Sequence, residues 1–176
     1  NTLDLNPVGA SEIAKDKDYA NFFMRRMGYP TVTGKTFFSN EWCKAIGSKN
    51  NVRAASIYAK KIGWPVIVKP NSSSQGKGVS LVHSDRELRA ALKEIFAYDD
   101  VALVQKQVKG KEYRIVILDG EVISAYERTP LTVIGDGRST IKQLLAEKQR
   151  QFNRAGRDTK IKPNDPRIKQ KLAKQG

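Results

Sequence analysis

A short apolar run at residues 66–68 most constrains what this chain can fold into. The run reads Val-Ile-Val, is bounded by Pro65 and Pro70, and is followed directly by Lys69. β-Branched residues in a short run between prolines are typical of a buried strand. Because burying an unpaired charge is costly, Lys69 must be paired, functional, or already in water as the last residue of the strand.

The rest of the chain divides into segments with helical or strand periodicity. Residues 85–96 place apolar side chains at helical spacing between charges, and Asp119-Gly120 between two apolar runs is a strong hairpin signal. This order of elements predicts an α+β sandwich with mostly antiparallel strands and flanking helices. We expect helices over residues 11–28, 39–47, 52–62, 85–96 and 141–152, and extended segments over residues 31–38, 64–70, 79–82, 102–108, 113–118 and 121–128.

The chain is strongly basic. Its 176 residues have a formal net charge of +14, and residues 142–176 contribute eleven Lys or Arg and three acids, a net +8. Such an excess predicts an anionic partner, whether nucleic acid, a membrane headgroup or a phosphate-rich small molecule. Nucleic-acid binding usually interleaves cations with aromatics, but the basic C-terminal stretch has one aromatic, Phe152. We interpret this stretch as a solvated helix end followed by a mobile segment.

Composition excludes several other classes of protein. No apolar run approaches the roughly 20 residues of a membrane span, and the start lacks the pattern of a signal peptide. The start also lacks an initiator Met, so we expect a piece of a longer chain. The single cysteine, Cys43, and the single histidine, His83, can form neither an internal disulfide nor a Cys/His zinc site. These features predict a reducing, cytoplasmic location.

Residues 70–78 are a candidate anion-binding loop between two strands. They contain three serines and two glycines, with Lys69 before them and Lys77 among them. Glycine lets backbone N–H groups approach an anion, and hydroxyl and ammonium groups add donors. The spacing differs from GxxxxGK[ST] and GxGxxG, and a strand follows, which excludes a P-loop. On spacing alone, a solubilising hairpin tip is the simpler explanation.

Two further segments carry groups that could bind a nucleotide. In residues 103–112 a strand runs into a glycine turn, so its free backbone groups could read a purine edge and Glu112 could accept from ribose hydroxyls. Arg128 ends a strand and could brace a phosphate or carboxylate bidentately. Taken alone, each segment also fits an ordinary hairpin. In residues 135–140 an Asp-Gly turn precedes a helix that Ser139 or Thr140 would cap.

Together, and in this order, these segments resemble the ATP-grasp fold. PVIVKP, a small-residue loop ending in GKGV, and LVQKQVKGKEYRIVILDGEVI are similar to the core of ATP-grasp carboxylate–amine ligases. AKDK, followed by a helix and a Gly-Tyr-Pro turn, resembles the segment before that core. YERTPLTVIGDGRSTIKQLL resembles cyanophycin synthetase and the ATP-grasp half of bifunctional glutathione synthetases, and D-alanine–D-alanine ligase shares the broader plan. The resemblance covers residues 10–145.

The resemblance implies roles for individual residues. Lys17 and Lys69 would bind phosphates, and residues 72–78 would form the mobile loop over the β- and γ-phosphates. Glu112 would hold the ribose hydroxyls, and Arg128 would be catalytic by steadying the transferred phosphoryl group and the acyl-phosphate. The implied nucleotide-binding set is Lys17, Lys69, Ser73, Ser74, Gln75, Gly76, Gly78, the adenine hinge of Gln105, Lys106 and Val108, and Glu112.

The chain departs from the family pattern in two places. Many relatives have a glutamate where this chain has Gln105, whose carbonyl can still accept from the adenine amino group. The family's magnesium ligands are an acidic pair and an asparagine on later strands, which Asp158 and Asp165 do not match. We therefore expect no complete metal site here, Mg²⁺ ligands beyond the end of the chain, and a second layer that lacks the C-terminal metal-binding strands.

The resemblance also implies a division of the chain. Residues 1–48 would be a helical lead-in with a weak linker, residues 49–109 the ATP-grasp lid subdomain, and residues 110–152 the start of the second subdomain. Residues 153–176 would be a basic, mobile tail.

The implied reaction is the joining of a carboxylate to an amine. ATP phosphorylates the carboxylate, and the amine attacks the acyl-phosphate to form an amide or peptide bond. This chemistry implies ATP and Mg²⁺ as cofactors, amino acids or short peptides as substrates, and a homo-oligomer, without a membrane or nucleic-acid partner. Two alternatives stay open: a non-catalytic nucleic-acid or polyanion binder that uses the tail, and a degenerate module that binds nucleotide as a regulator or scaffold.

Overall fold

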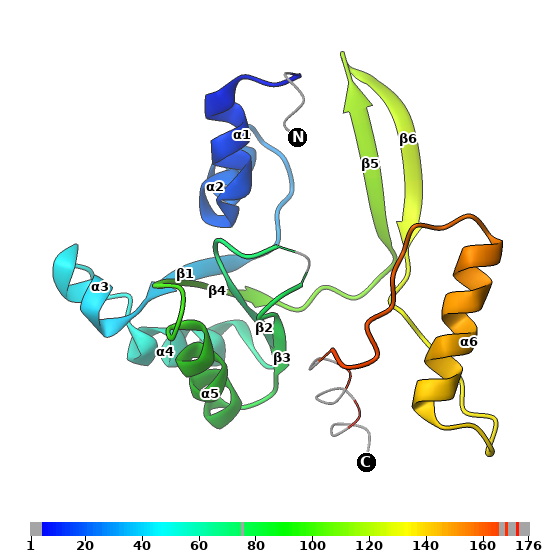
Figure 1. Cartoon of the computed structure of the whole chain (residues 1–176). Coiled ribbons are helices and arrows are strands. Elements are labelled where there is room, and N and C mark those ends of the chain that lie inside the picture. Colours follow the sequence, from blue (N-terminus) through cyan, green and yellow to red (C-terminus); the bar gives the residue numbers. More distant parts are fainter. Residues whose placement is uncertain (1–4, 75, 166–167, 169–171, 173–176) are drawn as a thin grey trace. The chain divides into compact units, whose positions relative to one another are not determined.

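A computed structural model describes residues 5–74, 76–165, 168 and 172 of the chain. It divides into two compact units, Asn1–Gly110 and Lys111–Gly176, hereafter unit 1 and unit 2, which we describe separately (Figure 1). Gln75, from the expected phosphate loop, and most of residues 166–176, from the expected tail, lie outside the described residues.

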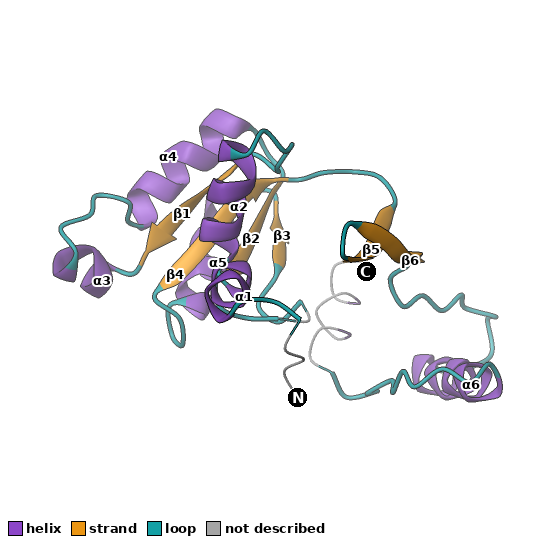
Figure 2. Ribbon diagram, turned by 90° about the horizontal axis from the view of Figure 1, so that it is seen from above, coloured by secondary structure: helices purple, strands orange, loops and turns teal. Residues whose placement is uncertain are grey.

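Unit 1 is built on a four-stranded sheet. Its strands are β1 (Gly34–Phe38), β2 (Val66–Pro70), β3 (Ser80–Val82) and β4 (Val101–Lys106). They lie in the order β1-β4-β2-β3, as Figure 2 shows, and every pairing between them is antiparallel. The predicted α+β architecture with antiparallel pairing and flanking helices is thus confirmed.

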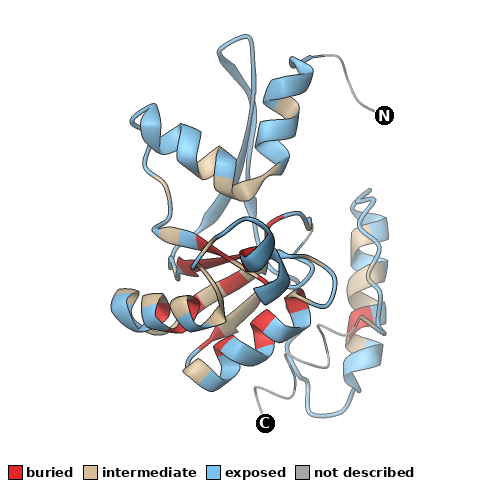
Figure 3. Ribbon diagram, turned by 90° about the vertical axis from the view of Figure 1, so that its left-hand side faces the viewer, coloured by how far each residue is buried: buried red, intermediate tan, exposed pale blue. Residues whose placement is uncertain are grey.

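Two helices form the core against one face of this sheet. They are α4 (Val52–Ile62) and α5 (Asp85–Ile95), and both contact the strands and each other. In α5, Leu88, Leu92 and Ile95 recur at helical spacing and are buried, and Ser84 caps the first turn by accepting from the N–H of Glu87. The buried residues concentrate on the inner sides of these helices and on the strands that the helices cover (Figure 3).

The N-terminal helical pattern forms two helices rather than the single one expected over residues 11–28. They are α1 (Val8–Lys15) and α2 (Lys17–Arg26), and Asp16 between them has extended backbone angles. One carboxylate oxygen of Asp16 accepts from the N–H groups of Asp18 and Tyr19, 2.9 Å each. This capping starts a new helix, because it satisfies donors that lack partners inside a helix's first turn.

The segment expected as a weak linker contributes to the sheet and its core. β1 pairs with β4 along its whole length, and Phe37 on β1 is 1% exposed. The short helix α3 (Asn40–Ala45) follows directly, with Ser39 as its N-cap. Residues 34–38 are therefore part of the sheet, and the subdomain division implied by the resemblance stays a prediction.

Unit 2 contains a two-stranded hairpin and a helix. The strands β5 (Glu112–Leu118) and β6 (Glu121–Arg128) pair with Leu118 opposite Glu121, so two residues form the turn. These are Asp119 and Gly120, with φ of 50° and 84°, as the predicted Asp-Gly turn requires. The helix α6 (Ile141–Arg154) is capped by Thr140 rather than Ser139, in a reciprocal capping box with Gln143.

Residues 159–161, which follow α6 in the basic C-terminal stretch, contact that helix again. The side chain of Gln149 accepts from the N–H of Ile161 at 2.6 Å and donates to the carbonyl of Thr159 at 3.0 Å. Within the described residues, no helix has the length and apolar character that crossing a membrane requires.

Candidate functional site

The sheet of unit 1 places two predicted site residues on the same face. Lys69 is paired with Leu103, and Gln105 with Ile67, so Lys69 and Gln105 stand on adjacent cross-strand rows. Side chains alternate between faces along a strand, so this face is opposite the one on which Val66, Val68 and Val104 pack against α4 and α5. The sheet therefore presents a half-buried ammonium and a buried amide on its second face.

Lys17 reaches this region from the start of α2. Its ammonium donates to the carbonyl oxygens of Asn71, at 2.6 Å, and Ser73, at 2.5 Å, which begin the loop after β2. Burial lowers the pKa of Lys17, and the carboxylates of Asp99 and Asp16 act against that shift. Lys17 thus contacts the candidate phosphate loop directly, although 54 residues separate it from Asn71.

Lys69 lies close enough to Lys17 for the two charges to interact. Burial lowers the pKa of Lys69 first, and the positive charge of Lys17 lowers it further. Among the described residues, neither lysine forms an ion pair with a carboxylate. Two half-buried ammonium groups that repel each other form a site to which an anion such as a phosphate would add favourable charge.

The loop between β2 and β3 has a fixed start. Ser72 bonds to Asp99 through both its N–H, at 3.2 Å, and its hydroxyl, at 2.5 Å. Gly76 and Gly78 have positive φ values of 73° and 70°, which a side chain would disfavour. Ser73 is half-buried, whereas Ser74, Gly76 and Gly78 are exposed, so the hydroxyl of Ser74 and the glycine backbone face solvent where a ligand could meet them.

The predicted adenine hinge follows β4. Gln105 is 5% exposed, while Val108 is 69% exposed. The N–H of Lys106 donates to the carbonyl of Thr33 at 2.8 Å, so the main-chain group that Lys106 could offer a ligand is its carbonyl. The N–H of Val108 has no backbone partner within the described residues. A carbonyl acceptor on Lys106 and an N–H donor on Val108, two residues apart, would match the alternating edge of a purine.

Glu112 and Arg128 belong to unit 2, where they face each other across the hairpin. They are cross-strand partners, and a guanidinium nitrogen (Nη1) of Arg128 lies 2.6 Å from Oε1 of Glu112. Lys111 and Glu127 form a second, longer contact of 3.4 Å beside them. Both pairs are exposed, so each contributes little to stability, and its groups are available to a ligand.

The described residues do not form a complete metal site. Within them, no group of three or more His, Cys, Asp or Glu side chains is placed to hold a metal ion. Asp158 is exposed and Asp165 is half-buried in the C-terminal stretch, and neither joins a second acid in such a group.

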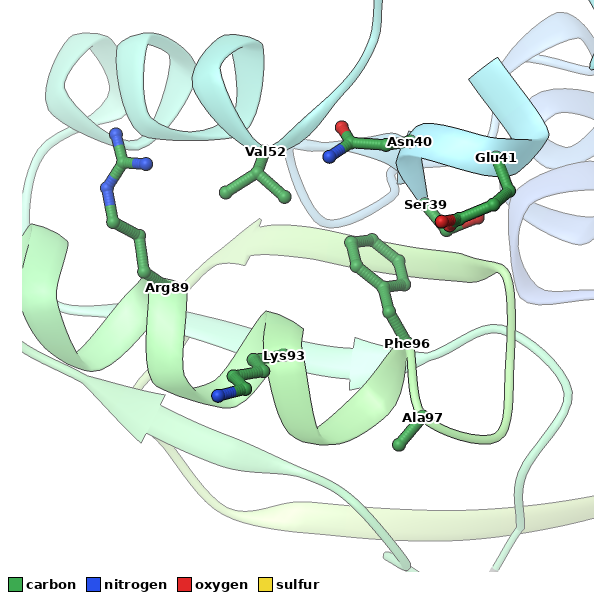
Figure 4. A pocket seen from close by; sticks show the side chains of 8 residues that line it. All are labelled: Ser39, Asn40, Glu41, Val52, Arg89, Lys93, Phe96 and Ala97. Carbon is green, nitrogen blue, oxygen red and sulfur yellow. The ribbon is translucent and has the colours of Figure 1, made fainter. Parts of the chain in front are cut away.

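A separate pocket of about 340 Å³ lies between α3 and α5, beside the start of α4 (Figure 4). Arg89 in its wall is already paired with Asp85 at 2.8 Å. The predicted nucleotide-binding residues do not line this pocket. Its lining residues are Ser39, Asn40, Glu41, Val52, Arg89, Lys93, Phe96 and Ala97.

Sequence reasoning missed residues that support the two lysines. Asp16 and Asn71 join α2 to the loop, and Asp99 holds Ser72. Asp16 carried a detectable signal, because an aspartate two residues before another acid in a polar stretch is a good helix N-cap. Asn71 and Asp99 carried none, since their partners are more than 25 residues away.

This fold defines the ATP-grasp class of protein. The D-alanine–D-alanine ligase of Bacillus anthracis, in a structure complexed with ATP, aligns with a TM-score of 0.55 and 26% identity, covering 69% of this chain and 37% of that one. A family model described as the D-ala D-ala ligase C-terminus matches residues 23–137. The chain therefore belongs to the D-ala D-ala ligase C-terminal family.

Two relatives match this chain in sequence. The glutathione biosynthesis bifunctional protein of Streptococcus mutans is 33% identical over 130 residues, covering 72% of this chain and 16% of the relative. Cyanophycin synthetase of Trichormus variabilis is 28% identical over 151 residues, covering 85% of this chain and 16% of the relative. The chain thus spans about one sixth of the length of these relatives. The resemblance predicted from the sequence is confirmed.

Proposed function

We propose that this chain is the ATP-binding portion of a ligase that joins a carboxylate to an amine through an acyl-phosphate. The observation that carries the proposal is the pair of half-buried lysines, Lys17 and Lys69, whose charges repel and which have no ion-pair partner in the described part of the chain. Bound polyphosphate would relieve that repulsion. The sheet face that carries Lys69 also carries Gln105, in the neighbouring cross-strand row.

Each residue at this face has a role that suits its chemistry. Lys17 and Lys69 bind the phosphates, and the loop with Ser73, Ser74, Gly76 and Gly78 covers them and excludes water. The amide carbonyl of Gln105 accepts from the adenine amino group. The carbonyl of Lys106 and the N–H of Val108 provide the neighbouring main-chain contacts. To serve Lys17, ATP must displace the loop carbonyls that its ammonium now contacts.

The resemblance also assigns roles in nucleotide binding to Glu112 and Arg128 of the unit 2 hairpin. Glu112 holds the ribose hydroxyls, and Arg128 stabilises the charge on the transferred phosphoryl group. Because these two side chains are paired at 2.6 Å, the nucleotide must part them, at the small cost typical of an exposed ion pair.

Magnesium belongs to this proposal as the ion that would neutralise charge on the phosphates of ATP when bound. The described residues do not provide its ligands, so we assign none of them to the metal. What these residues do is bind and orient the nucleotide.

The substrates and setting follow from the same proposal. Amino acids or short peptides would supply the carboxylate and the amine, as the names of the relatives suggest. We propose a homo-oligomer in a reducing cytoplasm, where the lone thiol of Cys43 stays unpaired. Residues 49–109 would act as the lid and residues 110–152 as the start of the second subdomain.

Thermal unfolding with and without Mg-ATP tests the proposal. Nucleotide that binds only the native state should stabilise the chain by about 2.7 kcal/mol at a hundredfold excess over the dissociation constant. The shift should vanish in Lys69→Ala and persist in Lys61→Ala, which changes an exposed lysine on α4. No shift in the wild-type chain would contradict ATP binding by these residues.

A polyanion-binding role for the basic stretch is the second candidate. It is supported by the net charge of +8 over residues 142–176 and by the cations of Lys148 and Arg157, which lie 5.7 and 5.4 Å from the ring centre of Phe152. This role predicts binding of short DNA that falls steeply with salt, is unaffected by ATP, and disappears when residues 153–176 are removed.

A degenerate regulatory module is the other alternative. It would bind ATP without turnover, so turnover by the full-length protein distinguishes it from the ligase.

A further inference from the structure

A hydrogen bond between Asp16 and Asn71 joins the two segments that carry the site's lysines. We propose that Asp16 and Asn71 are positioning residues that fix the spacing between Lys17 and Lys69, and so the geometry of the phosphate site. The inference rests on the proposed function and adds to it two residues that do not themselves touch the nucleotide.

Asp16 uses both carboxylate oxygens. Oδ1 accepts from the N–H groups of Asp18 and Tyr19, which fixes the first turn of α2. Oδ2 accepts from the side-chain amide of Asn71 at 2.7 Å. The first turn of α2 carries Lys17, so the carboxylate that starts the helix also fixes that helix to the loop.

Asn71 is bonded through every polar group it has. Its side-chain oxygen accepts from the N–H of Asp18 at 3.2 Å, and its backbone N–H donates to the carbonyl of Val101 at 2.9 Å. Its backbone carbonyl accepts from the ammonium of Lys17 at 2.6 Å. The residue is 8% exposed, and a buried side chain whose oxygen and nitrogen are both bonded, on a backbone that is bonded as well, holds a single orientation.

The position of these residues in the chain explains why their hydrogen bond affects the two lysines. Asp16 immediately precedes Lys17, and Asn71 follows Lys69 by two residues. Like charges on α2 and β2 would drive the two segments apart, whereas the Asp16–Asn71 bond holds them together. The two ammonium groups therefore stay near each other without an anion between them.

An exchange of the two side chains tests this inference. In Asn71→Asp a carboxylate would face the carboxylate of Asp16. In Asp16→Asn the amide oxygen caps α2, so an amide nitrogen faces the amide nitrogen of Asn71. The double variant Asp16→Asn/Asn71→Asp again places an amide donor opposite a carboxylate, with unchanged net charge and the capping oxygen retained.

The readout compares ATP with adenosine, measured by calorimetry on the full chain. Each single variant should lose roughly 10- to 100-fold in affinity for ATP, the range expected for a hydrogen bond to a charged group. Affinity for adenosine, which has no phosphates, should stay within about twofold. The exchanged pair should recover ATP affinity to within about threefold of wild type, because its donor–acceptor pattern is restored.

Several outcomes would overturn the inference. If wild type binds ATP and the single variants bind it equally well, the bond does not position the lysines. If ATP and adenosine lose affinity together, or the exchanged pair is not rescued, the two residues support the fold only. If wild type binds no ATP, the proposed function fails first. Should Asn71→Asp unfold at 25 °C, Asn71→Gln keeps the amide one methylene further out and should show the same selective loss.

Discussion

The side chain of Gln105 fills the space that any side chain at position 34 would need. A Cβ placed on Gly34 would lie 2.4 Å from Cγ of Gln105 and 3.1 Å from the carbonyl oxygen of Val104. Gly34 and Gln105 are cross-strand partners on β1 and β4, where two Cβ atoms normally share the space between strands. Glycine is thus required here to let the neighbouring strand's side chain approach closely.

Gly34→Ala should therefore weaken nucleotide binding through Gln105. Displacing the Gln105 amide removes an acceptor for the adenine amino group, and we expect about tenfold weaker ATP binding, equivalent to one neutral hydrogen bond. Preference for ATP over GTP should fall as well, because guanine has a carbonyl where adenine has that amino group. Calorimetric titration with both nucleotides measures the two effects.

Two variants control for effects on the fold alone. Gly9→Ala on α1 meets no atom within 4 Å and should bind ATP normally while gaining up to about 1 kcal/mol of helix stability. In Gln105→Ala, adding Gly34→Ala should cost little more, because the clashing Cγ is gone. Independent, additive losses from the two substitutions would show that Gly34 does not act through Gln105.

Local patterns predicted the elements of this fold well. The buried strand at residues 66–70, the amphipathic helix α5 and the Asp119-Gly120 hairpin all depend on periodicity or turn chemistry within a few residues. Such signals are readable in one sequence because neighbouring residues determine them.

Features that depend on distant partners were not predictable in the same way. Helical periodicity continues through Asp16 and predicted a single helix, although Asp16 itself is a good N-cap residue; the structure shows that it caps α2. An extended segment was expected over residues 31–38, but its place in the sheet depends on β4, more than 60 residues later. In the site, Lys69 was noticed because it follows a buried apolar strand, and Lys17 came from a resemblance. Asn71 and Gly34, by contrast, required knowledge of which chain segments lie against each other.

The carboxyl of Asp136 should titrate unusually low for an exposed group. Hydrogen bonds from the backbone and hydroxyl of Ser139, and then from the backbone of Arg138, lower its pKa from 3.8 to about 2. Because the folded pKa is depressed, its contribution to stability is present above about pH 4 and is lost as the pH falls towards 2. The carboxyl ¹³C shift followed from pH 6 to pH 1.5 should show this midpoint, and Ser139→Ala should raise it. A wild-type midpoint near 3.8 would contradict the hydrogen-bonded turn.

Glu112→Ala should separate ribose recognition from stability. Its ion pair with Arg128 is exposed, so the free energy of unfolding should change by no more than about 1 kcal/mol, which thermal unfolding measures. Affinity for ATP should fall roughly tenfold or more, the loss expected for hydrogen bonds to a charged group. Affinity for 2′,3′-dideoxy-ATP, which lacks both hydroxyls, should be low in wild type and unchanged in the variant. Glu127→Ala, which breaks the neighbouring pair with Lys111, is the matched control and should leave both affinities intact.

Lys69→Met should make the chain more stable and unable to hold polyphosphate. Burial and the charge of Lys17 lower the pKa of Lys69 below 10.5, so the folded chain binds fewer protons than the unfolded chain in the window beneath that value. Stability should therefore rise with pH across this window in wild type, and the rise should be smaller in Lys69→Met. ATP binding should follow the opposite trend, weakening as the pH rises and the ammonium loses its proton. Chemical unfolding and ATP titration from pH 7 to pH 10, with Lys61→Met as the control on α4, measure both slopes. If wild-type and Lys69→Met chains show the same pH dependence in both measurements, the Lys69 ammonium neither destabilises the fold nor binds the phosphates.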